Sequence, residues 1–376
     1  MKYCNFCLQP DSRPGTNFIN GSCPVCDFHR NSKPTDWIDR VETLKAQINT
    51  QKRKSSNPNY DSILGVSGGK DSTRQALWAR DYLGLKPLLV AITYPPEQST
   101  QIGVDNLNNL ANLGFDIYSS APAPKIWKAL MRESFINHGN WAKTTELALF
   151  SGVPQIALEM GISCILWGEN PALQVGASET LSKDGWDGNN LRHLNTISGI
   201  ELSDYESLGF SLEQLLPFAY PREIEFASGE LQIFFLGWAI KNWGLAENAL
   251  VGALNGLVGR QDSAVNTSDL LGYSSIDEDW VIVNQMIKYY KFGFGRATEY
   301  VNEWIRKGIL ERARGIDLVA RYDGKCSDKY ISSFCNYIEI DVSSFWELVR
   351  NFTNPDLFEI VKRGRPRRKF EIGQNL

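Results

Sequence analysis

A short polar segment with two adjacent glycines is the part of this chain best suited to chemistry. It reads Ser67-Gly68-Gly69-Lys70-Asp71-Ser72 and follows an apolar, β-prone run at residues 62–66. Apolar residues at helical spacing come next, and Asp71 and Ser72 are typical of a helix N-terminus. Adjacent glycines let backbone N–H groups approach an anion, and the first helical turn adds further donors. The segment therefore predicts a loop that binds the phosphates of a nucleotide.

Other loop types fit these residues less well. A Walker-type loop requires glycine where Leu64 stands and serine or threonine where Asp71 stands. Residues 65–69 also match the G-x-S-x-G pattern of hydrolases, which requires a histidine base. None of the chain's histidines has a recognisable base context: His29, His138 and His193. An ordinary glycine turn is the remaining structural alternative. The pattern S-G-G-x-D-S resembles the loop of the PP-loop ATP pyrophosphatases, which cleave ATP between its α and β phosphates.

Four of the seven cysteines form two C-x2-C pairs near the start of the chain: Cys4, Cys7, Cys23 and Cys26. Two such pairs can bring four thiolates around one tetrahedral ion, and Zn²⁺ is the usual occupant. With four protein ligands the site would be structural, and His29 is expected to lie outside it. Two disulfides or an iron–sulfur cluster are the alternatives. Because so short a segment cannot bury a core of its own, the metal would supply much of its folding energy.

Strand-like and helix-like segments alternate after residue 61, which predicts a parallel sheet with helices on both faces. Ligands of such sheets bind at the carboxyl ends of the strands, so Thr93 and residues 168–171 are expected near the glycine loop. The predicted strands are 62–66, 88–93, 115–118 and 162–167, and the predicted helices are 72–83, 103–113, 125–136 and 145–160.

The segments beyond and before this sheet complete the expected organisation. A zinc-binding module is predicted at 1–34, a connecting helix and linker at 35–60, the ATP-binding α/β domain at 61–265 with a substrate-covering insertion at 172–229, and a helical region with a basic tail at 266–376. Further helices are expected at 231–243, 279–290, 297–307, 310–322 and 344–352. Ser344 and Glu347 resemble a capping box that opens the last of these.

Composition excludes several classes of protein. The 376 residues are 43% hydrophobic and 22% charged, with a net charge of −4, as in an ordinary globular protein. No apolar run approaches the roughly 20 residues of a membrane span, and no signal peptide is recognisable, so we expect a cytoplasmic protein. The acidic balance counts against nucleic acid as a partner, apart from the basic tail at 362–369.

Four segments together resemble the N-acetyl sugar amidotransferase family and its WbpG-like branch, which acts in O-antigen and lipopolysaccharide biosynthesis. They are the cysteine pairs, residues 66–72, I-L-W-G-E-N-P at 165–171 and K-F-G-F-G-R-A at 291–297. The resemblance implies conversion of an acetamido group on a nucleotide-linked sugar, such as a UDP-2,3-diacetamido-uronic acid, into an acetamidino group. It further implies that ATP first adenylates the amide oxygen and that ammonia then displaces AMP.

The resemblance also implies roles for individual residues. ATP would be held by Ser67, Gly68, Gly69, Lys70, Asp71, Ser72 and Thr93. Of these, Asp71 would brace the loop or help to hold Mg²⁺, and Thr93 would meet the adenine or ribose. Catalytic roles fall on Glu169 and Asn170, beside the nucleotide, and on Lys291 and Arg296, which would stabilise charge on the α-phosphate. The structural alternatives are a capping acid for Glu169 and a solvated basic face for Lys291 and Arg296.

The source of ammonia is expected to be a separate protein. Cys164 lies within a predicted strand, no G-x-C-x-G occurs, and residue 2 is Lys2, so no glutaminase nucleophile is recognisable. In resembling systems a glutaminase and synthase pair, like that of histidine biosynthesis, supplies it.

The main rival is a PP-loop enzyme that modifies tRNA, either a thiolase or a lysidine-type synthetase. The acidic balance and the lack of a second active-site cysteine pair count against it. A zinc-bearing scaffold that only binds ATP is the non-enzymatic alternative.

Overall fold

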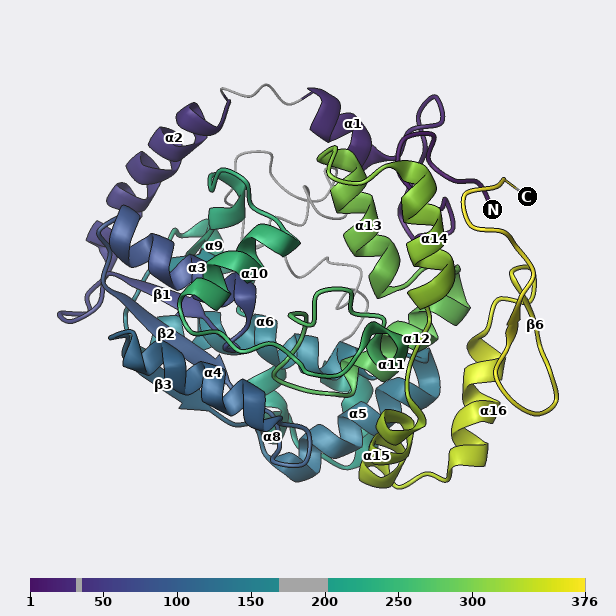
Figure 1. Ribbon diagram of the computed structural model, residues 1–376. Helices are drawn as coiled ribbons and strands as arrows, with labels where there is room; N and C mark the ends of the chain where they lie inside the picture. Colours follow the sequence, from purple (N-terminus) through teal and green to yellow (C-terminus); the bar gives the residue numbers. More distant parts are fainter. Residues whose placement is uncertain (32–35, 169–201, 376) are drawn as a thin grey trace. The chain divides into compact units, whose positions relative to one another are not determined.

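The computed structural model describes residues 1–31, 36–168 and 202–375, which form two compact units (Figure 1). The sheet unit comprises Ser32–Leu130 and Lys143–Gly259. The other unit, here called the cysteine–helix unit, comprises Met1–Asn31, Met131–Ala142 and Arg260–Leu376. The domain boundaries expected from the sequence remain predictions. Among the described residues, none of the helices combines the length and apolar character needed to cross a membrane.

The sheet unit contains the predicted parallel sheet. Its strands are β1 (Ser62–Gly65), β2 (Pro87–Ile92), β3 (Ile117–Ser120), β4 (Cys164–Trp167) and β5 (Gln232–Phe235). They lie in the order β3-β2-β1-β4-β5, and every neighbouring pair is parallel. The chain starts at the centre, builds outward through β2 and β3, and then crosses to β4. The carboxyl ends of β1 and β4 therefore flank the switch point where sheets of this kind bind ligands.

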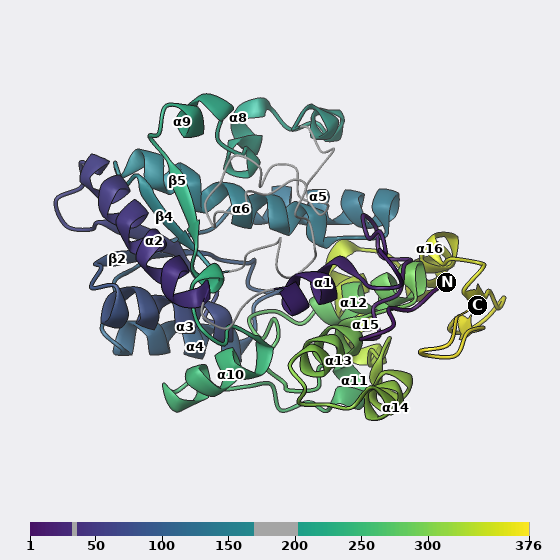
Figure 2. The ribbon, with the colours of Figure 1, turned by 90° about the horizontal axis from the view of Figure 1, so that it is seen from above.

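Both faces of the sheet are covered by helices. Alternate strand residues such as Leu64, Leu89 and Leu166 pack on one face in a buried core. That core is completed by α2 (Asp36–Gln51), α3 (Lys70–Leu77) and α4 (Gln101–Asn112). The other face meets α6 (Ala142–Glu159) at close range, because a Cβ on Gly152 would lie 2.6 Å from Ile92 Cδ1. Figure 2 shows α6 alongside β4 and β5.

The remaining helices of the sheet unit are short, and one prediction among them was wrong. They include α8 (Leu212–Leu215), α9 (Glu223–Ala227) and α10 (Leu245–Leu254), while α5 (Pro124–His138) begins here and ends in the other unit. The segment 231–243, expected as a helix, contains strand β5 followed by a 3-10 turn at Leu236–Trp238. A short, continuous apolar run does not distinguish a buried strand from a buried helix by its periodicity. Sheet pairing with β4 decides the outcome.

The cysteine–helix unit is built mainly from helices, as predicted for the C-terminal region. They are α1 (Pro24–Asn31), α11 (Ala264–Thr267), α12 (Val281–Phe292), α13 (Arg296–Arg306), α14 (Arg312–Tyr322), α15 (Asp328–Ile338) and α16 (Val342–Phe352). The fully buried Phe334 lies in an aromatic core, with ring centroids 5.3 Å from Phe135 and 5.9 Å from Trp280. The indole of Trp141 donates a hydrogen bond to the carbonyl of Trp280 at 3.0 Å.

One expectation for the C-terminal region requires correction. The predicted capping box at Ser344 was wrong by one turn, because α16 begins at Val342 and its N-cap is Asp341, which accepts from Ser344 N at 2.9 Å. The basic tail is part of the fold: β7 (Arg367–Arg368) pairs antiparallel with β6 (Phe358–Glu359). Arg365 also donates to Cys326 O at 2.7 Å.

Candidate nucleotide-binding site

The glycine loop connects β1 to α3 at the carboxyl end of the central strand. Gly69 is the N-cap of α3, and the first bond of the helix runs from Thr73 N to Gly69 O at 3.0 Å. The N–H groups of Lys70, Asp71 and Ser72 precede that bond, so the helix itself supplies no acceptor for them. Their partial positive charge and the helix dipole make this turn suitable for an anionic group.

Gly68 is the position in the loop where only glycine fits. Its φ is +76°, a conformation that side chains rarely adopt, and an added Cβ would lie 2.8 Å from Leu107 N in α4. Gly69 differs, since its φ is −84° and an added Cβ would meet only Ser67 Oγ, at 3.3 Å. Gly68 therefore brings the loop against the backbone of α4, while Gly69 tolerates a small side chain.

A buried polar network fixes the start of α3. The ammonium of Lys70, which is only 5% exposed, donates to Asp71 Oδ2 at 2.6 Å. The other oxygen of Asp71 accepts from Asn248 Nδ2 at 2.5 Å, and Asn248 Oδ1 accepts from Arg74 Nη1 at 2.6 Å. Asn248 is 1% exposed and lies on α10, 177 residues from Asp71. Both carboxylate oxygens of Asp71 are thus engaged in bracing the loop.

Asn248 and Arg74 were not identified from the sequence. Arg74 also donates to the carbonyls of Lys241 and Asn242, at 3.0 and 2.9 Å, and burial lowers its pKa. No local pattern marks Asn248, because its partners lie on a helix far away in the chain. The sequence shows only an arginine in the first turns of the predicted helix, and its partial burial, which calls for hydrogen-bond partners, is known from the structure.

The structure describes only some of the other residues that were predicted to lie beside the nucleotide. Thr93 follows β2 and is hydrogen-bonded to the end of the neighbouring strand β3. Its N–H donates to Ser120 O at 2.8 Å, and its hydroxyl donates to the same carbonyl at 3.3 Å. Its contact with adenine or ribose stays a prediction. Glu169 and Asn170 lie outside the described residues. Cys164 is a fully buried residue of β4, as expected, and burial raises the pKa of its thiol.

Lys291 and Arg296 belong to the cysteine–helix unit, and their catalytic roles stay predictions. Lys291 Nζ donates to His138 O at 2.7 Å, and Arg296 Nη1 lies 3.2 Å from Glu299 Oε2. The helix N-terminus between them binds an internal anion, Asp323. This buried carboxylate accepts from Gly295 N at 2.7 Å and from Thr298 Oγ1 at 2.5 Å. The glycines of this motif therefore shape a structural cap.

The four predicted cysteine ligands converge as expected. Their sulfur atoms lie within 4.8 Å of one another, and all four residues are buried. Cys7 and Cys23 have sulfurs 3.8 Å apart. That spacing matches a tetrahedron whose corners lie about 2.3 Å from a central Zn²⁺. Backbone N–H groups point at two of the sulfurs, from Cys23 to Cys4 Sγ at 3.3 Å and from Gln9 to Cys7 Sγ at 3.4 Å. The donor set fits zinc, and His29 is not part of this cluster.

The cysteine segment is attached to the C-terminal helices by hydrogen bonds. Leu8 N donates to Asn302 Oδ1 on α13 at 2.7 Å, and Arg312 Nε on α14 donates to Cys7 O at 3.3 Å. Arg306 Nη1 approaches Cys7 Sγ at 3.9 Å. The segment and the helices therefore form one folded unit.

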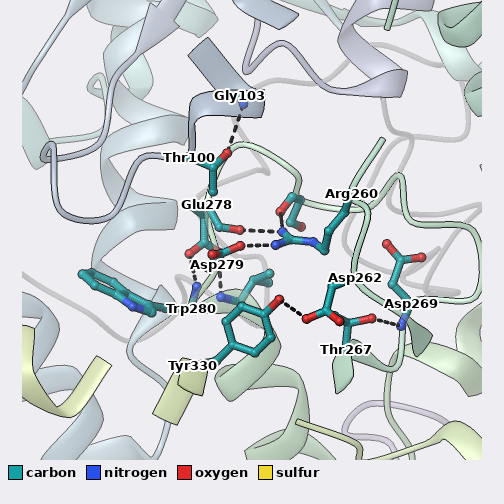
Figure 3. Close-up of polar contacts among 12 residues, drawn as sticks. Thr100, Gly103, Arg260, Asp262, Thr267, Asp269, Glu278, Asp279, Trp280 and Tyr330 are labelled. Atoms are coloured by element: carbon teal, nitrogen blue, oxygen red, sulfur yellow. Dashed lines mark hydrogen bonds and ion pairs between the residues drawn. The ribbon is translucent and has the colours of Figure 1, made fainter. Parts of the chain in front are cut away.

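A second polar network in this unit is structural (Figure 3). Arg260 pairs with Asp279 and donates to the carbonyls of Ser275 and Glu278, at 2.8 and 3.0 Å. Glu278 in turn accepts from Trp280 N at 2.7 Å at the start of α12. These contacts fix the segment between Arg260 and α12.

Comparison with known proteins agrees with the resemblance inferred from the sequence. Residues 269–370 match the family model described as LPS biosynthesis protein WbpG-like, C-terminal domain. The predicted resemblance to the WbpG-like family is confirmed, and it extends through the basic segment, which the sequence motifs had not included. No curated protein matches the chain.

Three solved structures are similar to parts of this chain at low identity. A predicted subunit of a tRNA methyltransferase from Methanocaldococcus jannaschii is 16% identical, with 51% of this chain and 74% of that chain covered and a TM-score of 0.26. An NH3-dependent NAD synthetase from Campylobacter jejuni is also 16% identical, with 61% and 100% covered and a TM-score of 0.29. An NMN synthetase from Francisella tularensis is 14% identical, with 57% and 90% covered and a TM-score of 0.26.

Proposed function

We propose that this chain is an ATP-dependent sugar amidotransferase, which converts an acetamido group of a nucleotide-linked sugar to an acetamidino group in the cytoplasm. The observation that carries the proposal is the combination of two features in one chain. A loop with the S-G-G-x-D-S pattern opens α3 at the switch point of a parallel sheet. A domain of the WbpG-like type, named for lipopolysaccharide biosynthesis, follows at residues 269–370.

Activation by ATP overcomes the low reactivity of the amide. Amide resonance makes the acetamido carbon a poor electrophile and its oxygen a poor leaving group. The amide oxygen attacks the α-phosphate of ATP, the bond to the β-phosphate breaks, and pyrophosphate leaves. The N–H groups of the first turn of α3 would hold the departing phosphates. Lys70 and Asp71 neutralise each other in this arrangement, so their role is to keep the turn in place.

Ammonia completes the exchange. It attacks the activated carbon, AMP leaves with the former amide oxygen, and loss of a proton gives the amidine. Glu169, Asn170, Lys291 and Arg296 keep their proposed catalytic roles in these steps. A separate glutaminase and synthase pair would supply the ammonia. Mg²⁺ would accompany ATP, and Asp71 takes the bracing role because both its oxygens already accept hydrogen bonds. Zinc at the four cysteines would stabilise the fold.

The test is mass spectrometry of candidate nucleotide sugars after incubation with the protein, ATP, Mg²⁺ and ammonium. The expected product is lighter by the difference between O and NH, and AMP and pyrophosphate appear in equal amounts. Glutamine should replace ammonium only when a glutaminase is added. A Gly68→Val variant serves as the control, since it fills the loop. AMP release on addition of tRNA, with no amidine from any nucleotide sugar, would instead favour the RNA-modifying alternative.

A further inference from the structure

Asn106 is a buried asparagine of α4 whose side chain binds one distant residue at two points. It is 1% exposed. Its Nδ2 donates to Val258 O at 2.9 Å, and its Oδ1 accepts from Val258 N at 2.8 Å. A side-chain amide has both donors and an acceptor, so it can satisfy both backbone groups of one residue. Asn106 thereby fixes the backbone of a residue that lies 152 positions further along the chain.

The segment that Asn106 binds comes directly after α10. That helix ends at Leu254, and Asn255 is its C-cap. Asn109, which lies on the same face of α4 as Asn106, donates from its Nδ2 to Asn255 O at 2.8 Å. The next residue is so close to α4 that a Cβ added to Gly256, whose φ is +88°, would lie 2.7 Å from Asn109 Oδ1. Two asparagines of α4 therefore hold the carboxyl end of α10.

The first half of α10 carries Asn248, which holds the glycine loop through its bond to Asp71 Oδ1 at 2.5 Å. Helix α10 is thus bonded to α3 near its amino end and to α4 beyond its carboxyl end, and Figure 2 shows it beside both helices. The loop also packs on α4 directly, because a Cβ added to Gly68 would lie 3.2 Å from the carbonyl carbon of Asn106. Asn106 therefore belongs to the part of α4 that the loop contacts.

The bond between Asn248 and Asp71 depends on the position of α10 relative to α3. Hydrogen bonds weaken steeply when donor and acceptor move apart or out of line. Residues 255–259 belong to no helix or strand, so sheet pairing does not fix the chain that leaves α10. The bonds from Asn106 to Val258 supply that restraint. Because α10 is short and regular, fixing its carboxyl end also restricts where Asn248 can lie.

We propose that Asn106 is a positioning residue of the glycine loop, which acts through α10 to keep Asn248 on Asp71. This inference rests on the proposed function, because it takes the loop to be the ATP site. None of the sequence motifs includes Asn106, and its role requires no contact with the nucleotide. It determines how well the first turn of α3 is arranged to receive the phosphates.

The role is tested by titrating ATP with Mg²⁺ into the full-length protein, without any sugar, and measuring the heat of binding. Asn106→Leu keeps a side chain of similar size and removes both hydrogen bonds, so it should weaken ATP binding about tenfold. Asn108→Leu is the matched control, because Asn108 is an exposed asparagine of the same helix. It should bind ATP like the wild type. The free energy of unfolding is measured for each protein, and binding is compared at a temperature where all are folded.

A double-mutant cycle with Asn248→Ala shows whether Asn106 acts through α10. The double variant should bind ATP as weakly as Asn248→Ala alone, because the side chain that Asn106 positions is already missing. If the two losses of affinity multiply, Asn106 acts independently of Asn248, and the proposal is overturned. An Asn106→Leu protein that is less stable but binds ATP like the wild type would have lost only a structural bond, which also overturns it.

The outcomes separate this role from the proposed function. Unchanged ATP affinity in Asn106→Leu, while the wild type forms amidine, overturns the positioning role alone. ATP affinity that depends on Asn106, without amidine from any nucleotide sugar, supports the role and overturns the proposed function. A wild type that binds no ATP overturns both. If Asn106→Leu does not fold, Asn106→Asp keeps the acceptor for Val258 N and should weaken ATP binding by a smaller factor, whereas wild-type affinity in this variant overturns the role.

Discussion

Asn248 Nδ2 donates to Asp71 Oδ1 at 2.5 Å, and this bond joins helix α10 to the glycine loop across 177 residues. The same amide accepts from Arg74 through its oxygen, at 2.6 Å. All three side chains are at least partly buried. A substitution at Asn248 would therefore leave the carboxylate of Asp71 and the guanidinium of Arg74 each without one hydrogen-bond partner. The loop geometry therefore depends on a residue that does not itself belong to the loop.

Replacing Asn248 with alanine should destabilise the protein by about 1–3 kcal/mol and raise the KM for ATP. Asn248→Asp should be at least as harmful, since it places a second carboxylate beside Asp71. Urea denaturation and ATP-consumption kinetics measure the two effects. Asn255→Ala, at the C-cap of the same helix, is the control, because the side-chain amide of Asn255 donates to the nearby Val251 O at 2.8 Å. Equal losses in Asn248→Ala and Asn255→Ala would contradict this view of the network.

The two glycines of the loop should respond differently to alanine. Gly68→Ala forces a side chain into a positive φ and against Leu107 N, so we expect a loss of at least about 1–2 kcal/mol and little ATP binding. Gly69→Ala should cost less than about 1 kcal/mol, because its φ is negative and its single close contact is a flexible serine. Thermal unfolding with and without ATP compares the pair. A Gly69→Ala protein as damaged as Gly68→Ala would refute the argument.

Metal removal should loosen the C-terminal helices as well as the cysteine segment. We expect elemental analysis to find zinc in the purified protein and Cys23→Ser to lose it. Since Leu8 and Cys7 bind Asn302 and Arg312, a chelator should speed hydrogen exchange in α13 and α14. Cys335→Ser, at a buried cysteine outside the cluster, should retain zinc. Zinc loss without faster exchange in these helices would show that the two parts fold separately.

Lowering the pH should reduce the free energy of unfolding, in part because Glu299 becomes protonated. Burial alone would raise its pKa, but Lys288, Arg296 and Arg13 lower the pKa of Glu299 to about 2. The unfolded value is about 4.3, so the unfolded chain binds this proton first. The stabilisation is therefore complete above about pH 4.3 and is lost as the pH falls toward 2. Free energies of unfolding measured across this range should fall less steeply in Glu299→Gln. An identical pH dependence of the unfolding free energy in the wild type and in Glu299→Gln would contradict this role of Glu299.

The sequence predicted the features that depend on local patterns. The glycine loop, the paired cysteines and the alternating strands were all identifiable, because turns, metal ligands and helix spacing have short-range signatures. Segment 231–243 was misjudged because burial on both faces removes the alternation that marks a strand. Asn248 and Asp323 could not be found this way. Each acts on a partner from another element, and that proximity is set by tertiary packing.

The docking of the cysteine segment has a consequence for how the chain is made. Leu8 and its partner Asn302 are 294 residues apart, and Tyr3 N binds Asn375 Oδ1 at 2.8 Å. A ribosome releases the amino-terminal partner long before the other, and domains generally fold as they emerge. The four cysteine thiols are therefore synthesised before the C-terminal helices that pack on them in the folded protein, and the whole sheet is synthesised in between. Binding of a metal ion by the four thiolates at that stage would protect them from oxidation.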